Sequence, residues 1–488
     1  FSASETFYSD KRPFFSENHN LFNVQGYRFF YVINTRRIGA SPDYNCSEDF
    51  SLQQDLCEDA QKGANDIDAA FRYTQQGENF DVGFLGAFEA NEKFSEGKDF
   101  YSARLRTKRD NLTVGYLGTY VNRPVIDRTA KVNALDFEYR PSSIRRLSGA
   151  ILTSDVNGET GYGFNLGYGH DPSKNRHNGV GVYYFDENLD INDMGYLVRN
   201  DWLMIGGRAS IKQTNFSQDS ITRARKYEIG YSLKSTSDFE KEPSGLSFSA
   251  ENSFTNTSEI KAEIFYRTTG KDNLITRKST LSPYINMPKG YGVELEYRGP
   301  SDDFLQYGFE VDRRQGSRYS AALGWQTSYQ GKVSISPADT LSLSLFYKHG
   351  QEEDWLNWLQ DNVLGTYEKK QRTTIAGLQW FKGNKHELRI KAQMVAFTAR
   401  DPQAYLGDLY GNLNPSSNIN LSPITLSELA FQVRYRYELM PLAYLYVVYT
   451  KGGRIVADDT EDDLSELYKR PWNDPQSDNF TVKIRYRF

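Results

Sequence analysis

Charged side chains in two parts of the sequence are the residues whose types and spacing could bind or gate a polar solute. Within residues 5–22, acids and bases lie among aromatic residues, and two arginines follow at 36 and 37. Near the C-terminus, arginine or lysine occupies every second position of two short segments. Side chains of both signs at this spacing can form ion pairs across strands or contact a charged solute. We therefore expect these residues to line or gate a pore: Glu5, Asp10, Lys11, Arg12, Glu17, Arg36, Arg37, Arg434, Arg436, Lys483 and Arg485.

Catalytic chemistry finds little support in the sequence. The histidines, at 19, 170, 177, 349 and 386, are scattered, and none belongs to an HExxH pair. The sequence has no GxSxG motif and no phosphate-binding glycine loop, so no nucleophile can be given a neighbouring base. We therefore expect no enzymatic activity, no metal ion and no cofactor.

The alternation of apolar with polar residues indicates the elements that must position the charged side chains. In NFTVKIRYRF (479–488), every second residue from Phe480 is apolar, and the residues between are threonine, lysine or arginine. The same period of two returns along the chain, for example in 291–298 and 428–439. This period is typical of β-strands with one apolar and one polar face. We therefore predict an all-β fold of antiparallel strands.

The composition favours a barrel in a membrane over a soluble sandwich. The 488 residues include 34 Tyr, 30 Phe and 38 Gly, and the mean hydropathy is -0.66. No apolar run approaches the ~18 residues of a membrane helix, and a net charge of -5 gives no basic surface for nucleic acid. Aromatic residues gather on the apolar face, while the other face mixes acids with bases. We predict a transmembrane antiparallel β-barrel of about 20 strands (range about 18–22), with lipid outside and polar groups inside.

The lengths of turns and loops predict how this barrel is divided and oriented. We expect an N-terminal segment over residues 1–64 and the barrel over residues 65–488. If the last strand ends at the periplasmic rim, short turns at 383–386 and 440–441 are periplasmic, and long loops at 350–370, 399–426 and 451–478 are extracellular. Within the first of these loops, EEDWLNWLQDNV (352–363) predicts a short amphipathic helix.

The apolar side of the last strand has a further predicted role. In outer-membrane barrels, a terminal aromatic strand is read by the barrel assembly machinery. We therefore expect these residues to form the assembly signal: Phe480, Val482, Ile484, Tyr486 and Phe488.

The two cysteines predict a disulfide. Cys46 and Cys57 lie eleven residues apart in a polar, acidic stretch. Two lone cysteines at this spacing indicate one local disulfide in an oxidising compartment. A pair of free thiols is the alternative.

The first forty residues resemble a known family. ETFYSDKRPFFSENHNLF (5–22) and FFYVINTRRIGASP (29–42) are similar to a bacterial outer-membrane family catalogued as a domain of unknown function, whose members read approximately E-T-F-F-P-E-K-R-P-F-F-L-E-G and then F-Y-S-R-R-I-G. The sequence departs from this pattern at Asn18, where the family usually has glycine, and in VINTRR (32–37), which replaces a tighter SRR. The resemblance implies a barrel preceded by a periplasmic or plug-like segment. Members commonly carry a family-nine-type carbohydrate-binding module upstream, which implies such a module as a partner.

Segment 5–22 has two interpretations that the sequence leaves open. In the first, it is a plug or a rim clamp that gates the lumen, with its acids paired to Arg36 and Arg37 at the end of the next strand. In the second, it is an ordinary first strand and turn, in which Pro13 stiffens the bend.

These features predict an integral protein of the outer membrane of a Gram-negative-type bacterium. We expect a conduit or gated pore for a polar solute. The alternatives are a surface platform with a plugged lumen that anchors or secretes a partner protein or glycan, and an outer-membrane hydrolase. The expected partners are outer-membrane lipid and lipopolysaccharide, the barrel assembly machinery, and either the upstream module or a surface or periplasmic protein; nucleic acid is not expected.

Overall fold

The computed structural model describes residues 10, 12–24, 29–44, 63–92, 95–277, 284–316 and 323–486. Most of them lie in β-strands that pair antiparallel with their neighbours, which confirms the all-β prediction. No helix in this part of the chain is long and apolar enough to cross a bilayer. The chain divides into two compact units, described in turn: the first runs to Ser210 and includes Gly230–Glu242, and the second holds Ile211–Ile229 and the chain from Pro243 onward.

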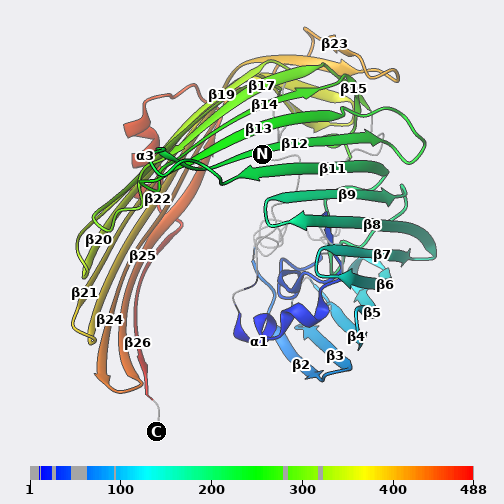
Figure 1. Ribbon diagram of the computed structural model, residues 1–488, viewed down its shortest axis with the longest axis horizontal. Coiled ribbons are helices and arrows are strands. Elements are labelled where there is room, and N and C mark those ends of the chain that lie inside the picture. Colours follow the sequence, from blue (N-terminus) through cyan, green and yellow to red (C-terminus); the bar gives the residue numbers. More distant parts are fainter. Residues whose placement is uncertain are drawn as a thin grey trace, which may run out of the picture. The chain divides into compact units, whose positions relative to one another are not determined.

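Consecutive antiparallel strands form the sheet of the first unit (Figure 1). They are β2 (Ile67–Gln76), β3 (Phe80–Glu89), β4 (Asp99–Arg109), β5 (Leu112–Arg123), β6 (Arg128–Ser142), β7 (Arg145–Val156), β8 (Glu159–Ser173) and β9 (Arg176–Phe185). Short turns join several of them. Asp110 has φ 49° in the turn between β4 and β5, and Asn157 has φ 51° in the turn between β7 and β8. Asp and Asn tolerate this left-handed conformation, which lets two strands reverse within two residues.

The residues before β2 form short elements that lie outside this sheet. They are α1 (Pro13–Ser16), η1 (His19–Phe22), β1 (Phe30–Tyr31) and η2 (Thr35–Arg37), with η4 (Pro124–Ile126) and β10 (Tyr196–Leu197) later in the unit. β1 pairs with β10. The interpretation of segment 5–22 as an ordinary first strand is wrong for its described residues, because Pro13 occupies the first turn of a helix, a position where its missing N–H costs nothing.

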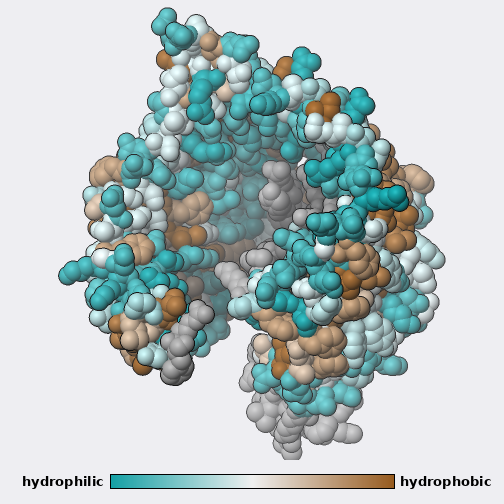
Figure 2. Space-filling model, turned by 60° about the horizontal axis from the view of Figure 1, so that its bottom comes forward, coloured by the Kyte–Doolittle hydropathy of each residue, from teal (hydrophilic) through white to brown (hydrophobic). Residues whose placement is uncertain are grey.

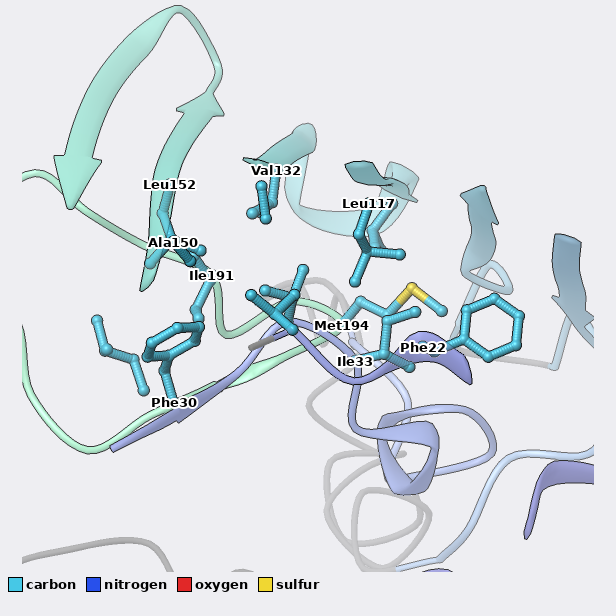
Figure 3. Close-up of a cluster of buried hydrophobic side chains, with 14 of the residues drawn as sticks. Phe22, Phe30, Ile33, Leu117, Val132, Ala150, Leu152, Ile191 and Met194 are labelled. Atoms are coloured by element: carbon cyan, nitrogen blue, oxygen red, sulfur yellow. The ribbon is translucent and has the colours of Figure 1, made fainter. Parts of the chain in front are cut away.

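The two faces of this sheet differ in what covers them. Phe84, Tyr116, Leu135 and Ile151 are 38 to 62 % exposed, whereas their chain neighbours Leu85, Leu117, Ala134 and Leu152 are at most 3 % exposed. The buried face, called the covered face below, packs against residues of the N-terminal segment and of the loop 186–201 (Figure 3). Apolar residues therefore lie on both faces of the sheet, and the covered face also holds buried charged residues such as Arg104 and Asp136.

The second unit contains the longer strands. Its elements are β13 (Gly245–Phe254), β14 (Glu259–Arg267), β15 (Gly270–Asp272), β16 (Ile285–Met287), β17 (Gly290–Arg298), β18 (Leu305–Gln315), β19 (Trp325–Ala338), β20 (Leu341–Gln360), β21 (Val363–Lys382), β22 (His386–Gly407), β23 (Leu413–Pro415), β24 (Ile424–Met440), β25 (Ala443–Ala457), α3 (Leu464–Asn473) and β26 (Ser477–Arg485). β11 (Trp202–Gln213) and β12 (Thr222–Ser235) contain residues of both units. In the described residues the large sheet has twenty-two strands, counting the three-residue β23, which agrees with the predicted range of 18 to 22.

The second unit also has an apolar and a polar face. The register aligns Ile264 with Val293, and Tyr297 with Phe309. Each of these except Tyr297 is more than 40 % exposed, as is Leu345 on the same face. Figure 2 shows such hydrophobic residues (brown) at the molecular surface among hydrophilic ones. The charged residues of β14 and β17 lie on the opposite face, called the polar face below, as the period of two predicts.

The predicted loop at 350–370 and the helix within it are wrong. β20 continues to Gln360 and β21 begins at Val363, so only two residues turn the chain. Trp355 pairs with Tyr367 across this hairpin, and both pack with Phe397 in a buried cluster. Aromatic side chains fit a pleated, half-buried surface well, and this packing overrides the helical pattern. Strands also shorten the other two predicted loops, since β22 ends at Gly407 and β25 at Ala457.

Helix α3 lies against the sheet of the second unit. Asp463 caps it by accepting hydrogen bonds from the backbone of Ser465 and Glu466. The ring of Trp472 contacts Phe431 at 5.6 Å, and the hydroxyls of Tyr468 and Thr374 lie 3.1 Å apart. Phe431 points to the apolar face, so the loop 458–476 folds back over that face.

Candidate functional site

The N-terminal segment docks on the covered face through an apolar core. Leu21, Phe22 and Ile33 meet Leu117 and Leu152, and all five are at most 4 % exposed. Figure 3 shows Phe22, Phe30 and Ile33 pointing from the segment towards the strands. Gly83 leaves room for this approach, because a Cβ there would lie 2.9 Å from Leu21 and Phe22. The segment is thus part of the hydrophobic core of its unit and is stabilised by burial.

A buried ion pair fixes the same segment. The guanidinium of Arg104 on β4 lies 2.5 Å from the carboxylate of Asp136 on β6, and both side chains are at most 1 % exposed. Arg104 also donates to the main-chain carbonyls of Leu21, at 3.1 Å, and Asn23, at 3.2 Å. Gly115 lies between the pair, where a Cβ would come within 2.7 Å of both partners. One fully enclosed arginine therefore binds the segment and the sheet together.

Arg72 holds the end of α1 from the first strand of the sheet. It donates to the carboxylate and the carbonyl of Glu17, both at 2.7 Å, and to the carbonyl of Phe14. Next to it, the amide of Asn18 donates to the hydroxyl of Thr74 at 3.2 Å. Asn18 has φ 51°, a left-handed conformation that suits glycine or asparagine. This explains why asparagine can stand where the resembling family has glycine.

Asp10 and Arg12 join the start of the N-terminal segment to its residues Thr35 and Ile38. Arg12 donates to the Asp10 carboxylate at 2.6 Å and to the carbonyls of Thr35 and Ile38. The Thr35 hydroxyl donates to Asp10 at 2.9 Å. Burial alone would raise the pKa of Asp10, but the hydrogen bonds from Arg12 and Thr35 outweigh it, and the pKa lies below its ordinary value.

A second charged cluster attaches the end of the segment to the strand ends. Arg123 contacts Asp43 at 2.5 Å and Asp193 at 2.8 Å, while Arg128 contacts Asp193 at 2.7 Å. Burial alone would raise the pKa values of Asp43 and Asp193, but hydrogen bonds from the arginines outweigh it and lower both. Arg37, which lies in η2 rather than at a strand end as predicted, donates to the carbonyl of Gly195 at 3.2 Å.

The polar face of the second unit carries the C-terminal candidates. Glu387 on β22 is 2 % exposed and contacts Arg434 at 3.2 Å and Arg436 at 3.0 Å. Arg389 is a third partner of this carboxylate. Lys483 and Arg485 lie on the same face of β26, opposite Tyr446 and Tyr444. Mixed charge on this face thus gives cross-strand ion pairs, as the sequence predicts.

The predicted assembly strand is β26. Phe480, Val482 and Ile484 are 56 to 69 % exposed on the apolar face, opposite Tyr449, Val447 and Leu445, and Tyr486 is 50 % exposed. Their role as an assembly signal stays a prediction.

Several predicted residues lie outside the described residues: Glu5, Lys11, Cys46, Cys57 and Phe488. The disulfide and the division at residue 64 stay predictions. Among the charged residues, no sequence pattern indicates Arg72, Asp43, Arg123 or Asp193 as partners, because each joins segments far apart in the chain.

Comparison with known proteins gives a family and a set of distant structures. The sequence matches the family described as Domain of unknown function (DUF5916) over residues 106–488. This range does not include residues 5–42, which carry the resemblance described above. No upstream carbohydrate-binding module is shown. No curated protein matches.

Among solved structures, the siderophore receptor PirA from Acinetobacter baumannii is 10 % identical, with TM-score 0.43, over 87 % of this chain and 75 % of that one. The ferric enterobactin receptor PfeA from Pseudomonas aeruginosa is 9 % identical, with TM-score 0.38, over 77 % and 76 %. A bacterial polysaccharide outer membrane secretin is 10 % identical, with TM-score 0.27, over 68 % and 96 %.

Proposed function

We propose that this chain, which belongs to the DUF5916 family, forms an outer-membrane β-barrel. The barrel would act as a gated conduit for a polar solute. The exposed apolar faces of both units would contact lipid, and the polar face of the second unit would line the conduit. The N-terminal segment would be the gate.

The observation that carries this proposal is the docking of the segment on the covered face. A segment that only connected the barrel to an upstream domain would not need a buried arginine to hold its carbonyls. Arg104 and Asp136 do so from within the sheet. Because a barrel of about 20 strands is wide enough to enclose an aqueous channel or a plug, a segment bound to its wall can obstruct passage.

The peripheral contacts of the segment are suited to release. Arg72 and Glu17 meet at 2.7 Å, but the Glu17 side chain is 71 % exposed. An exposed ion pair of this kind contributes only about 0.2–1 kcal/mol. The outer end of the segment can therefore detach while the core around Arg104 stays in place.

The test is conductance in planar bilayers with a tether across the gate. Asn18 and Thr74 are in hydrogen-bond contact, so N18C/T74C in a C46S/C57S background would be oxidised to lock the segment. We expect oxidation to suppress conductance and reduction to restore it, while N18C alone, treated identically, stays unaffected. Conductance that persists after complete cross-linking contradicts the gate.

A plugged platform that anchors or secretes a partner is the second candidate. The complete burial of Arg104 favours it, since a plug held this firmly could be permanent. In that case bilayers stay silent with and without the tether, and a stoichiometric partner copurifies from native membranes.

The location and the other partners are part of the same proposal. An outer-membrane barrel contacts lipid and lipopolysaccharide and is inserted by the barrel assembly machinery. A shift in gel migration on boiling tests the folded barrel, and fractionation of the membranes tests its location.

A further inference from the structure

Six cations form one group on the polar face of the second unit. They are Arg389 and Lys391 on β22, Arg434 and Arg436 on β24, and Lys483 and Arg485 on β26, called the basic tract below. We infer that the basic tract binds an oxyanion group, a carboxylate or a phosphate, of the solute that enters the conduit. This inference names the solute class and rests on the proposed function only for its transport readout.

The strand register brings these cations together. Arg389 lies directly opposite Arg434, and Glu387 lies opposite Arg436. Continuing across the sheet, Arg436 aligns with Tyr446 and then with Lys483. Neighbouring strands lie about 4.8 Å apart, so the distance from β22 to β26 is about 14 Å. Tyr446 lies between Arg436 and Lys483, and Tyr444 lies between Glu438 and Arg485; their phenols can donate further hydrogen bonds.

The acids beside the basic tract on the same face, Glu387 and Glu438, are outnumbered by its cations. Glu387 is shared by three arginines, so its single negative charge faces three positive ones. The Nε of Arg434 is buried without an acceptor among the described residues. The side chains of Lys391, Lys483 and Arg485 form no ion pair or hydrogen bond within the part of the chain that the structure describes. Their ammonium and guanidinium donors are available to a ligand.

Charge is segregated along the polar face rather than mixed evenly. On β14, β17 and β18 three opposed pairs are acidic: Glu263 with Glu294, Glu294 with Asp312, and Glu296 with Glu310. Two further pairs join opposite charges, Glu259 with Arg298 and Lys261 with Glu296. Cations interleave there, since Lys261 contacts Glu263 at 3.0 Å and Arg314 contacts Glu294 at 3.3 Å. An anion is repelled from those strands and attracted to the basic tract, which localises it on β22 to β26.

A wall stabilised only by ion pairs would not have this composition. Like charges directly opposite each other on neighbouring strands are destabilising. Arg389 and Arg434 are such a pair, and Glu387 is the one acid that contacts either of them among the described residues. A bound oxyanion would relieve this repulsion and accept the remaining donors, and planar guanidinium groups match carboxylate and phosphate oxygens.

The experiment measures binding to the full-length protein in detergent by isothermal titration with citrate and, separately, with inorganic phosphate at low ionic strength. We expect saturable binding of at least one probe, weakened at least about tenfold in R434Q/R436Q, as for the loss of charged hydrogen bonds. K391Q/K483Q removes two cations without described partners and should also weaken binding while leaving the fold intact. The control R298Q removes an arginine paired with Glu259 and Glu296, away from the basic tract, and should bind as the unmodified protein does.

The outcomes separate this inference from the conduit. Binding of citrate alone assigns a carboxylate, and binding of phosphate alone assigns a phosphate. No saturable binding of either probe, or equal affinity in all variants, overturns the inference. In bilayers, the anion-to-cation permeability ratio should fall in K391Q/K483Q relative to R298Q. If the protein binds a probe but shows no conductance in bilayers, the proposed conduit is overturned and the oxyanion site is not.

Discussion

The carboxylate of Asp136 and the guanidinium of Arg104 lie 2.5 Å apart inside the first unit, and neither side chain is more than 1 % exposed. The same guanidinium donates to the carbonyl of Leu21, 83 residues earlier in the chain. The pair thus joins two strands of the sheet to the segment that covers them. Burying both charges is costly, and only the complete set of hydrogen bonds compensates for it.

Replacing Arg104 by methionine should release the segment. It leaves the Asp136 charge buried without its partner, and breaking such a pair costs about 3–5 kcal/mol. We expect rapid proteolysis within residues 12–24 and a lower free energy of unfolding in urea. The control R140M removes an arginine that is more than half exposed and pairs with Glu138 at 2.5 Å on the same sheet. Equal protease resistance of R104M and R140M would show that the buried pair does not hold the segment.

Substitutions at Asn18 should follow its backbone conformation. At φ 51°, glycine is at least as favourable as asparagine, whereas a β-branched residue is disfavoured by about 1–2 kcal/mol. We expect N18G to dock the segment as the unmodified protein does, after allowance for the lost hydrogen bond to Thr74. N18V should expose it to hydrogen exchange. Because both variants lose that hydrogen bond, a difference in hydrogen exchange between them reports the cost of the left-handed backbone conformation at residue 18. Identical exchange in the two variants would contradict this cost.

Acid should detach the end of the segment at Asp43. The arginine contacts lower the folded-state pKa values of Asp43 and Asp193, so their ionised forms stabilise the docked state. This stabilisation is complete above the unfolded pKa, about 3.9 for aspartate, and is lost as the pH falls through the lower folded values. Hydrogen exchange of residues 35–44 should therefore increase below about pH 4.

D193N is the matched test of that pH dependence. It removes a charge that both Arg123 and Arg128 contact and should make exchange faster at neutral pH with a shallower acid response. An unchanged pH profile in D193N would assign the acid response to other groups.

The alternating strands could be predicted from the sequence because a period of two is a local property. Arg104 stands between Ala103 and Leu105 in the sequence, as a charged residue of an alternating strand does, but the carbonyls that it binds belong to a segment far away in the chain. The alternation in the sequence does not reveal the covered face, for a related reason. Leu117 and Leu152 follow exposed Tyr116 and Ile151 directly, and an apolar residue on both faces hides the period that reveals a strand.

The hairpin at Trp355 shows how packing overrides a local pattern. Residues 352–363 have the apolar spacing of a helix, yet Lys369 lies 4.9 Å from the Trp355 ring and contacts Glu352 at 2.8 Å, both across the β20–β21 hairpin. Contacts between strands that a sequence pattern does not contain therefore decide the element.

The two faces of β26 give the last prediction, because neighbouring residues there point in opposite directions. Val482 is 56 % exposed on the apolar face opposite Val447, and Thr481 lies opposite Val448 on the polar face. An arginine facing the lipid of a barrel costs about 2–4 kcal/mol at mid-membrane, whereas the lumen tolerates it. V482R should therefore reduce the heat-modifiable, membrane-inserted fraction, and T481R should leave it unchanged. Equal yields of the two variants would contradict the assignment of the apolar face to lipid, and a larger loss in T481R would reverse it.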